Sequence, residues 1–358
     1  MSSDSLTAST SLEPSPSGAG RREHRYDIDL LRVVCAGFVI LLHVAGDYVT
    51  GVDADPANGA AVYWTGIVAN SMSRFAVPLY FAMAGWAVLF GAPPRDGRRL
   101  AKRMARVVVP LFVWTALYLA WDHVRGANEQ STLELAGESL LASVRPAYHL
   151  WYLYAYVPVI LFLGFIVLLR AGRRPWGIAA ALLGFAVAGV QVTAVERVTG
   201  WDWPLVDWNF GLYHVLYAAG GALVLTLEGT KVPRWVRALV SVAGLGAVIW
   251  FQHAVHYVIP NANLLTVVFS FAVALTVSRM RVPERIRPWL GKLSAASFGA
   301  YLVHLLILRF LTERLVSPEL GWGAAIGLLL GITAVTTALA FGASLLWGKS
   351  ARLRGLLG

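Results

Sequence analysis

The chain has 358 residues, of which 57% are hydrophobic and 14% are charged, with a formal net charge of +10 and a mean hydropathy of +0.62. Soluble domains average roughly 45–50% apolar and about 25% charged residues, so this composition predicts an integral membrane protein. The single cysteine, Cys35, excludes a disulfide scaffold, and long apolar blocks without two-residue alternation exclude an outer-membrane barrel.

The chain divides into three parts by composition. Residues 1–24 are rich in serine, proline and glycine, which predicts a disordered cytoplasmic tail. Residues 25–350 form the expected membrane-embedded domain, and residues 351–358 a short cytoplasmic tail. The first apolar block is too long for the hydrophobic region of a signal peptide, so we expect it to be an uncleaved first span.

Apolar blocks recur along the whole middle part. A helix needs about 20 apolar residues to cross the hydrocarbon core, and the third and eighth blocks are shorter than this. We expect an all-α fold, a polytopic membrane helix bundle with about ten transmembrane helices. They cover Ile28–Tyr48, Tyr63–Phe90, Val107–Trp121, Leu150–Leu169, Trp176–Val195, Phe210–Leu227, Ala238–Ile259, Leu264–Val277, Leu293–Leu315 and Trp322–Trp347.

Basic residues gather in alternate segments between these spans. Of the 30 basic residues, 23 lie in one set of segments, whereas the opposite set holds only Arg125, Arg145, Arg197 and Arg314. The positive-inside rule then predicts cytoplasmic termini and an even number of spans. The positive charge is explained by orientation, so we expect no nucleic-acid partner. The spans predict a multi-pass protein of the plasma membrane. Arginine greatly outnumbers lysine, which GC-rich genomes favour, so we expect a bacterial source.

Three basic residues fall inside the predicted spans: Arg32, Arg74 and Arg309. An ionisable group within a span costs several kcal/mol, so it is a functional-site hypothesis by default. Arg309 lies in the outer part of its helix. We expect it to extend to the interface or to pair with Glu313, four residues later.

The first span pairs an arginine with a histidine. Arg32 and His43 are eleven residues apart, which in a helix is three turns plus ~20°, so both project from one face at a separation of ~16 Å. Asp47 follows four residues after His43, within reach of a hydrogen bond. An imidazole held by a carboxylate accepts a proton on its other nitrogen, which makes His43 a candidate general base. The alternative is a structural pair, in which His43 bonds a neighbouring helix and Arg32 reaches lipid headgroups.

A basic stripe precedes the third span. Arg99, Arg103 and Arg106 are spaced i, i+4 and i+7, so they share one face if the helix begins before them. Guanidinium groups suit phosphate oxygens, which favours a site for a cytoplasmic donor with several phosphates. Contact with membrane lipid headgroups is the alternative.

Two further segments hold polar residues at the edge of a span or within one. His149 and Trp151 open the fourth span from outside, where an interfacial aromatic belt is the alternative. Ser297, Tyr301 and His304 lie in the ninth span, where packing is the alternative. The other in-span histidines lack the carboxylate or thiolate partners of a metal site, so we expect no metal.

These motifs together resemble the acyltransferase-3 family of membrane proteins, in its surface-polysaccharide O-acyltransferase-like branch. The resemblance runs over most of the chain from Arg25 onward. The residues that carry it are the Arg-x10-His spacing of Arg32 and His43, the segment Ser73–Gly85, Arg103-x-x-Arg106, His149-Leu-Trp151 and the segment Ser297–His304.

The resemblance implies transfer of an acyl group from cytoplasmic acyl-CoA, commonly acetyl-CoA, to a hydroxyl or amine of a carbohydrate or lipid-linked acceptor. It implies that His43 is catalytic and that Arg32, Arg103 and Arg106 bind the donor. From their spacing we add Asp47 to the catalytic residues and Arg99 to the donor site. The expected substrate-binding residues are Arg74, His149, Trp151, Ser297, Tyr301 and His304. A transporter or flippase, with the same residues lining a path, is the alternative.

Overall fold

The computed structural model describes residues 24–128, 130–200, 206–209, 211–227, 232–256, 261–278 and 280–358. Every regular element in these residues is a helix, so the expected all-α fold is confirmed. The predicted N-terminal tail lies outside the described residues, apart from its last position.

The helices follow one another as a single series. They are α1 (Tyr26–Thr50), η1 (Pro56–Asn58), α2 (Ala60–Ser73), α3 (Ala76–Trp86), η2 (Ala87–Gly91), α4 (Gly97–Val124), α5 (Thr132–Glu138), η3 (Arg145–Leu150), α6 (Trp151–Arg170), α7 (Trp176–Thr199), α8 (Leu212–Val224), α9 (Arg234–Ala254), α10 (Leu264–Val277), η5 (Glu284–Ile286), α11 (Arg287–Leu315), α12 (Trp322–Trp347) and α13 (Ala351–Leu357).

Eight helical segments among the described residues are long and apolar enough to cross a membrane. They agree with eight of the expected spans, and the multi-pass membrane bundle is confirmed. The remaining two expected spans correspond to the shorter helices α8 and α10. The count of ten and the cytoplasmic position of both termini stay predictions.

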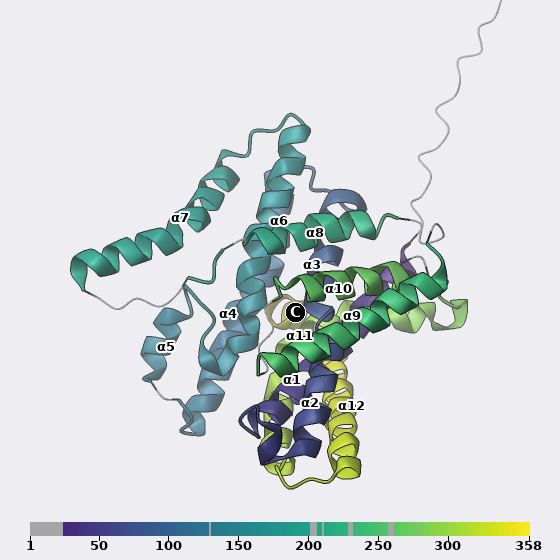
Figure 1. Cartoon of the computed structure of the whole chain (residues 1–358). Coiled ribbons are helices and arrows are strands. Elements are labelled where there is room, and N and C mark those ends of the chain that lie inside the picture. The colour runs from purple at the N-terminus through teal and green to yellow at the C-terminus, as the bar shows by residue number, and fades with distance from the viewer. Residues whose placement is uncertain are drawn as a thin grey trace, which may run out of the picture.

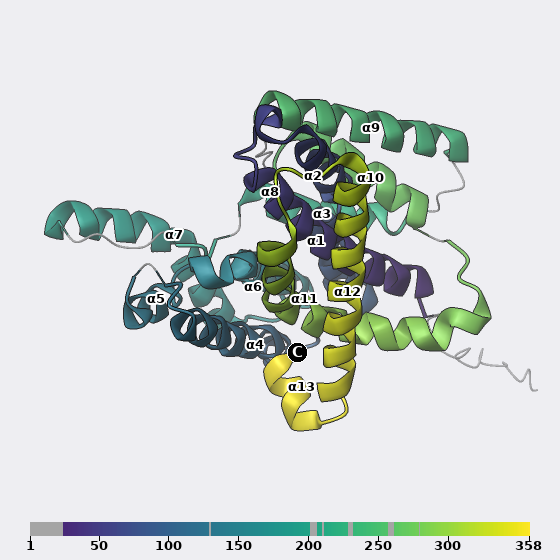
Figure 2. The ribbon, with the colours of Figure 1, turned by 90° about the horizontal axis from the view of Figure 1, so that it is seen from below.

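Helix α1 forms the centre of the bundle. It packs against α2, α3, α11 and α12, and the two views in Figures 1 and 2 show it among these helices. Cys35, Val44, Ala45 and Tyr48 are each 0% exposed. Helix α1 is therefore covered by other helices on several sides.

The basic segment before the third span is part of the same helix as that span. Helix α4 begins at Gly97, where the Asp96 side chain accepts a hydrogen bond from the backbone N–H of Arg99 at 2.7 Å. An aspartate at this position satisfies a free N–H of the first turn. The helix therefore begins before the basic stripe, and its three arginines do share one helical face.

The second expected span is interrupted. Helix α2 ends at Ser73 and α3 begins at Ala76, so Arg74 and Phe75 lie at a break. Pro78 has no N–H, so the carbonyl of Arg74, four residues earlier, has no regular helical partner. The break places the Arg74 side chain between two helical segments.

Helix α7 extends away from the other helices in both views (Figures 1 and 2). Of its 24 residues only Leu182 is buried. Such exposure of an apolar helix is what a lipid-facing span requires, because the bilayer core solvates apolar side chains.

Helices α3 and α8 approach closely through small residues. A side-chain carbon at Gly85 would clash with the backbone carbonyl of Ala218, and one at Gly221 would clash with Ala82. Small residues at such a crossing let two membrane helices pack backbone to backbone. This contact holds α3, with Met83 and Ala84, against the rest of the bundle.

We expect Gly85→Ala to destabilise the protein by about 1–3 kcal/mol, because the added methyl group meets backbone that cannot move alone. Thermal unfolding of the detergent-solubilised protein measures the effect. The control is Gly184→Ala in α7, where a side-chain carbon would meet nothing within 4 Å. Equal melting of the Gly85 variant and the control would contradict this account of the crossing.

Candidate active site

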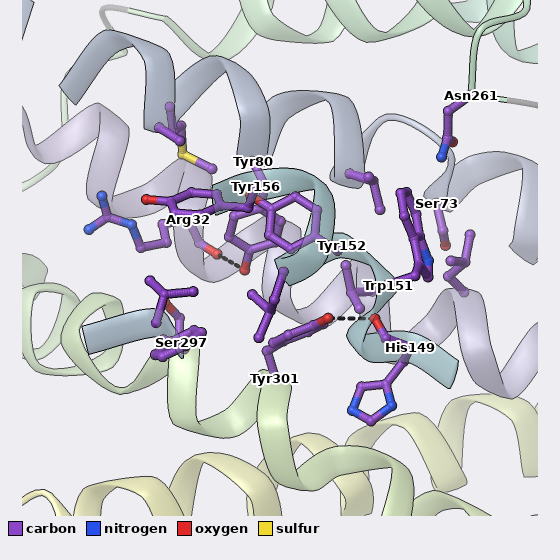
Figure 3. Close-up of a pocket in the computed structure, with 18 of the residues that line it drawn as sticks. Arg32, Ser73, Tyr80, His149, Trp151, Tyr152, Tyr156, Asn261, Ser297 and Tyr301 are labelled. Carbon is purple, nitrogen blue, oxygen red and sulfur yellow. Dashed lines mark hydrogen bonds between the residues drawn. The ribbon is translucent and has the colours of Figure 1, made fainter. Parts of the chain in front are cut away.

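A cavity of about 310 Å³ lies beside α1. It collects predicted site residues from five parts of the chain: Arg32, His43, Arg74, Arg103, His149, Trp151, Ser297 and Tyr301. Arg32 and His43 line the same cavity, as their spacing predicts. Figure 3 shows Arg32 and Ser297 towards one end of this cavity and Trp151 and His149 towards the other.

At the first end, protein partners hold the guanidinium of Arg32. Its Nη1 donates to Ser294 Oγ at 2.9 Å and lies 3.6 Å from Asp29 Oδ1. Ser294 Oγ in turn donates to Asp29 Oδ1 at 2.6 Å. Partners on α1 and α11 thus balance the charge of Arg32 within the bundle, which favours the functional interpretation over contact with headgroups alone.

Tyrosines form the middle of the cavity. Tyr80, Tyr152, Tyr156 and Tyr301 line it, and Figure 3 shows them between Arg32 and His149. The hydroxyl of Tyr80 donates to the carbonyl of Arg32 at 3.1 Å. The sequence analysis missed all of these except Tyr301. The spacing of Tyr152 and Tyr156, one helical turn apart in the segment that follows His149, is the signal that could have found two of them.

At the other end, His43 lies among aromatic rings and histidines. Its Nδ1 is 2.9 Å from the hydroxyl of Tyr148. The rings of His149 and His304 are centred 6.3 Å and 5.2 Å from its own ring. Tyr148, which the sequence analysis did not select, is therefore the direct partner of the candidate base.

The predicted hydrogen bond between His43 and Asp47 is wrong. Asp47 Oδ2 accepts a hydrogen bond from Thr312 Oγ1 at 2.6 Å instead. The spacing of four residues permits contact on one helix, but α11 packs against α1 and offers a hydroxyl that the carboxylate takes. Asp47 therefore ties α1 to α11 and does not contact the imidazole.

His304 and His149 are buried beside His43. His304 is 0% exposed, and its Nδ1 donates to the carbonyl of Tyr301 at 2.5 Å. The hydroxyl of Tyr301 donates to the carbonyl of His149 at 2.6 Å, as the dashed line in Figure 3 shows. His304 is outside the cavity lining. No group of histidine, cysteine and carboxylate side chains in the described part of the chain is placed to hold a metal ion.

The basic stripe is only partly joined to the cavity. Arg103 lines it, whereas Arg99 and Arg106 are exposed and lie outside the lining. Arg99 is instead 3.6 Å from Asp96. The stripe thus has one member in the cavity and two on the surface of α4.

Of the two alternatives expected for Arg309, the pairing with Glu313 is wrong. Glu313 pairs with Arg125 at 2.6 Å, and Arg309 lies 3.4 Å from Asp122. Asp122 lies in the last turn of α4 and Arg125 directly follows that helix, which packs against α11. Arg309 therefore pairs with Asp122 of a neighbouring helix and not with Glu313 of its own helix.

A second pocket of about 270 Å³ adjoins the first. The two share Leu42, His43 and Arg74, and the second adds the polar residues Asp47, Thr50, Asn70 and Tyr148. It lies towards the C-terminal end of α1, the end opposite Arg32. His43 and Arg74 therefore stand where two pockets of different character meet.

A family model described as an acyltransferase domain matches residues 25–344. No curated protein and no solved structure matches the chain. The matched residues contain the whole lining of both pockets. Because this match covers nearly all of the chain, the protein belongs to the acyltransferase-3 family and is a multi-pass membrane acyltransferase that uses an acyl donor and an acceptor.

Proposed function

We propose that this protein transfers an acyl group, most simply acetyl, from cytoplasmic acyl-CoA to a hydroxyl or amine of a carbohydrate or lipid-linked acceptor. We place it in the plasma membrane of a bacterium. The single observation that supports this most is the shared cavity, whose lining contains two cations, Arg32 and Arg103, and an imidazole, His43.

The first pocket suits the thioester arm of the donor. Its volume of about 310 Å³ is at the lower end for ligand sites, so it fits a slender chain better than a whole nucleotide. Arg32 and Arg103 supply guanidinium groups for the phosphates that follow that chain. The exposed Arg99 and Arg106 extend the positive surface on which the nucleotide rests outside the cavity.

The second pocket suits an acceptor that bears hydroxyl groups. Asp47, Thr50 and Asn70 give it hydrogen-bonding groups of both kinds, whereas the Tyr148 hydroxyl bonds His43. It reaches His43 from the side opposite the donor. In this arrangement the acyl group alone passes between the two sides, and CoA stays at the cytoplasmic end.

The chemistry follows from the position of His43. Its free ring nitrogen takes the proton of the acceptor hydroxyl, and the oxygen attacks the thioester carbonyl carbon. The tetrahedral intermediate then collapses, the carbon–sulfur bond breaks, and the CoA thiolate receives the proton from the imidazolium. Arg74, which lines both pockets, stabilises the developing oxyanion. An acyl-histidine intermediate would use the same nitrogen.

We expect His43→Ala to abolish release of free CoA, because no other group at the junction replaces the base. The assay follows free thiol from purified protein with acyl-CoA and candidate acceptors. His253→Ala is the matched control, since His253 lies outside both pockets and bonds the hydroxyl of Tyr63. Full activity of a correctly inserted His43 variant would refute the assignment, and wild-type substrate movement across vesicles without CoA release would favour a transporter.

We expect Arg103→Glu to raise the KM for acyl-CoA by about tenfold or more with a smaller effect on kcat, because it removes a charged hydrogen-bond donor from the donor end. Lys102→Glu, the same charge reversal at an exposed neighbour, controls for net charge. The KM of the Arg106→Glu variant for acyl-CoA should lie between the values of these two variants. An unchanged KM in the Arg103 variant would count against this donor site.

We expect Asp47→Asn to keep kcat within about threefold of the wild-type value, because the carboxylate contacts Thr312 and not His43. An essential partner of a general base would instead cost on the order of 100-fold or more. Steady-state CoA release at saturating donor and acceptor measures the difference. A loss of that larger size would return Asp47 to the catalytic group.

A further inference from the structure

Tyr148 and Arg309 form a chain of contacts that ends on His43. The proposed function assigns no role to Arg309 or to the bond between Tyr148 and His43. Tyr148 lies in η3, just after Ala147, where the backbone departs from helical geometry with φ −121° and ψ 31°. Tyr148 is 38% exposed and lines the second pocket, yet its hydroxyl lies 2.9 Å from Nδ1 of His43. An exposed ring with its polar atom on a half-buried imidazole is a directed contact rather than simple packing.

The bond decides which nitrogen of His43 serves a substrate. Nδ1 is engaged by Tyr148, and Nε2 has no hydrogen-bond partner in the part of the chain that the structure describes. When the ring acts as a base, Nδ1 carries the hydrogen and donates it to the phenol oxygen. The same bond persists once Nε2 has taken a proton, so the ring keeps one orientation through the reaction.

Arg309 fixes the segment that carries Tyr148. From α11 its Nη1 lies 3.2 Å from the carbonyl of Pro146, and its Nη2 lies 3.3 Å from the carbonyl of Arg145. Nη1 also lies 3.4 Å from Asp122 Oδ2. The guanidinium carbon is 5.6 Å from the centre of the Tyr148 ring, within the range of a cation–π contact.

We propose that Tyr148 is a positioning residue for His43: its hydroxyl holds Nδ1 so that Nε2 faces the acceptor and thioester, and Arg309 keeps Tyr148 in place. This inference rests on the proposed function, because it assigns the orientation of the base in that reaction. It gives a reason for the contacts that Arg309, an arginine within a span, makes with two backbone carbonyls and one aromatic ring. It also gives the base an orienting partner in place of Asp47.

The test is Tyr148→Phe, which keeps the ring and its contact with Arg309 but removes the hydroxyl. Misplacing a reacting group by about 1 Å can cost 100-fold, so we expect kcat to fall by about 10- to 100-fold. The KM values for acyl-CoA and acceptor should stay within about twofold, because neither substrate loses a contact.

The matched control is Tyr63→Phe. The hydroxyl of Tyr63 lies 2.8 Å from Nδ1 of His253, so this variant also breaks a tyrosine–histidine bond, outside both pockets. Its kcat should equal the wild-type value. Melting temperatures of both variants show that the comparison is between folded proteins.

Arg309→Lys tests the proposal that Arg309 keeps Tyr148 in place. Lysine keeps the charge but cannot span both carbonyls, so the kcat of this variant should fall. The kcat of the double variant with Tyr148→Phe should be no lower than that of Tyr148→Phe alone. Multiplying losses would show that Arg309 acts independently.

Three results separate the outcomes. A wild-type protein that consumes no thioester overturns the proposed function together with this inference. An active wild type with an equally active Tyr148→Phe variant overturns the inference alone. A variant with unchanged kcat and a raised acceptor KM makes Tyr148 a wall of the acceptor pocket and equally overturns the positioning role.

Discussion

The arrangement of this bundle depends on the need to give every charged group within the membrane a partner inside the protein. Hydrocarbon offers no solvation to a guanidinium, so an arginine in a span must meet carboxylates, hydroxyls or carbonyls from other helices. Arg32 meets Ser294 and Asp29, and Arg309 meets Asp122 and two backbone carbonyls. Ser294 and Asp122 lie on helices distant in sequence from their arginines, so the bonds that stabilise these charges also join α1 and α4 to α11.

The site is built in two halves on this frame. The first pocket is lined by cations and tyrosines, and the second by a carboxylate, a hydroxyl, an amide and a phenol. His43 stands between them on α1, which packs against α2, α3, α11 and α12. The family assignment gives an acyl donor and an acceptor, and the contrast between the halves provides each of them with a chemically suitable place.

Regular helices made part of this site predictable. The spacing of Arg32 and His43 translates directly into a shared face because α1 is unbroken from Tyr26 to Thr50. The contacts of Asp47 and Arg309 were predicted wrongly for the opposite reason: partners four residues away are visible in a sequence, whereas Thr312 and Asp122 become neighbours only when helices pack. Tyr148 was missed because it reaches His43 from a short irregular helix whose direction no periodic pattern gives. The polysaccharide-modifying branch of the family stays a prediction, since no residue here identifies the acceptor.

The two pockets have only Leu42, His43 and Arg74 in common. Apart from Tyr148, which bonds His43, the residues that line only the second pocket can therefore change without altering the lining of the first. A protein divided in this way can exchange one acceptor for another during evolution while its acyl donor stays the same. The reason is that different residues determine the specificity for each substrate. Diversity of products then requires only a few changes in the lining of the second pocket, not a new catalyst.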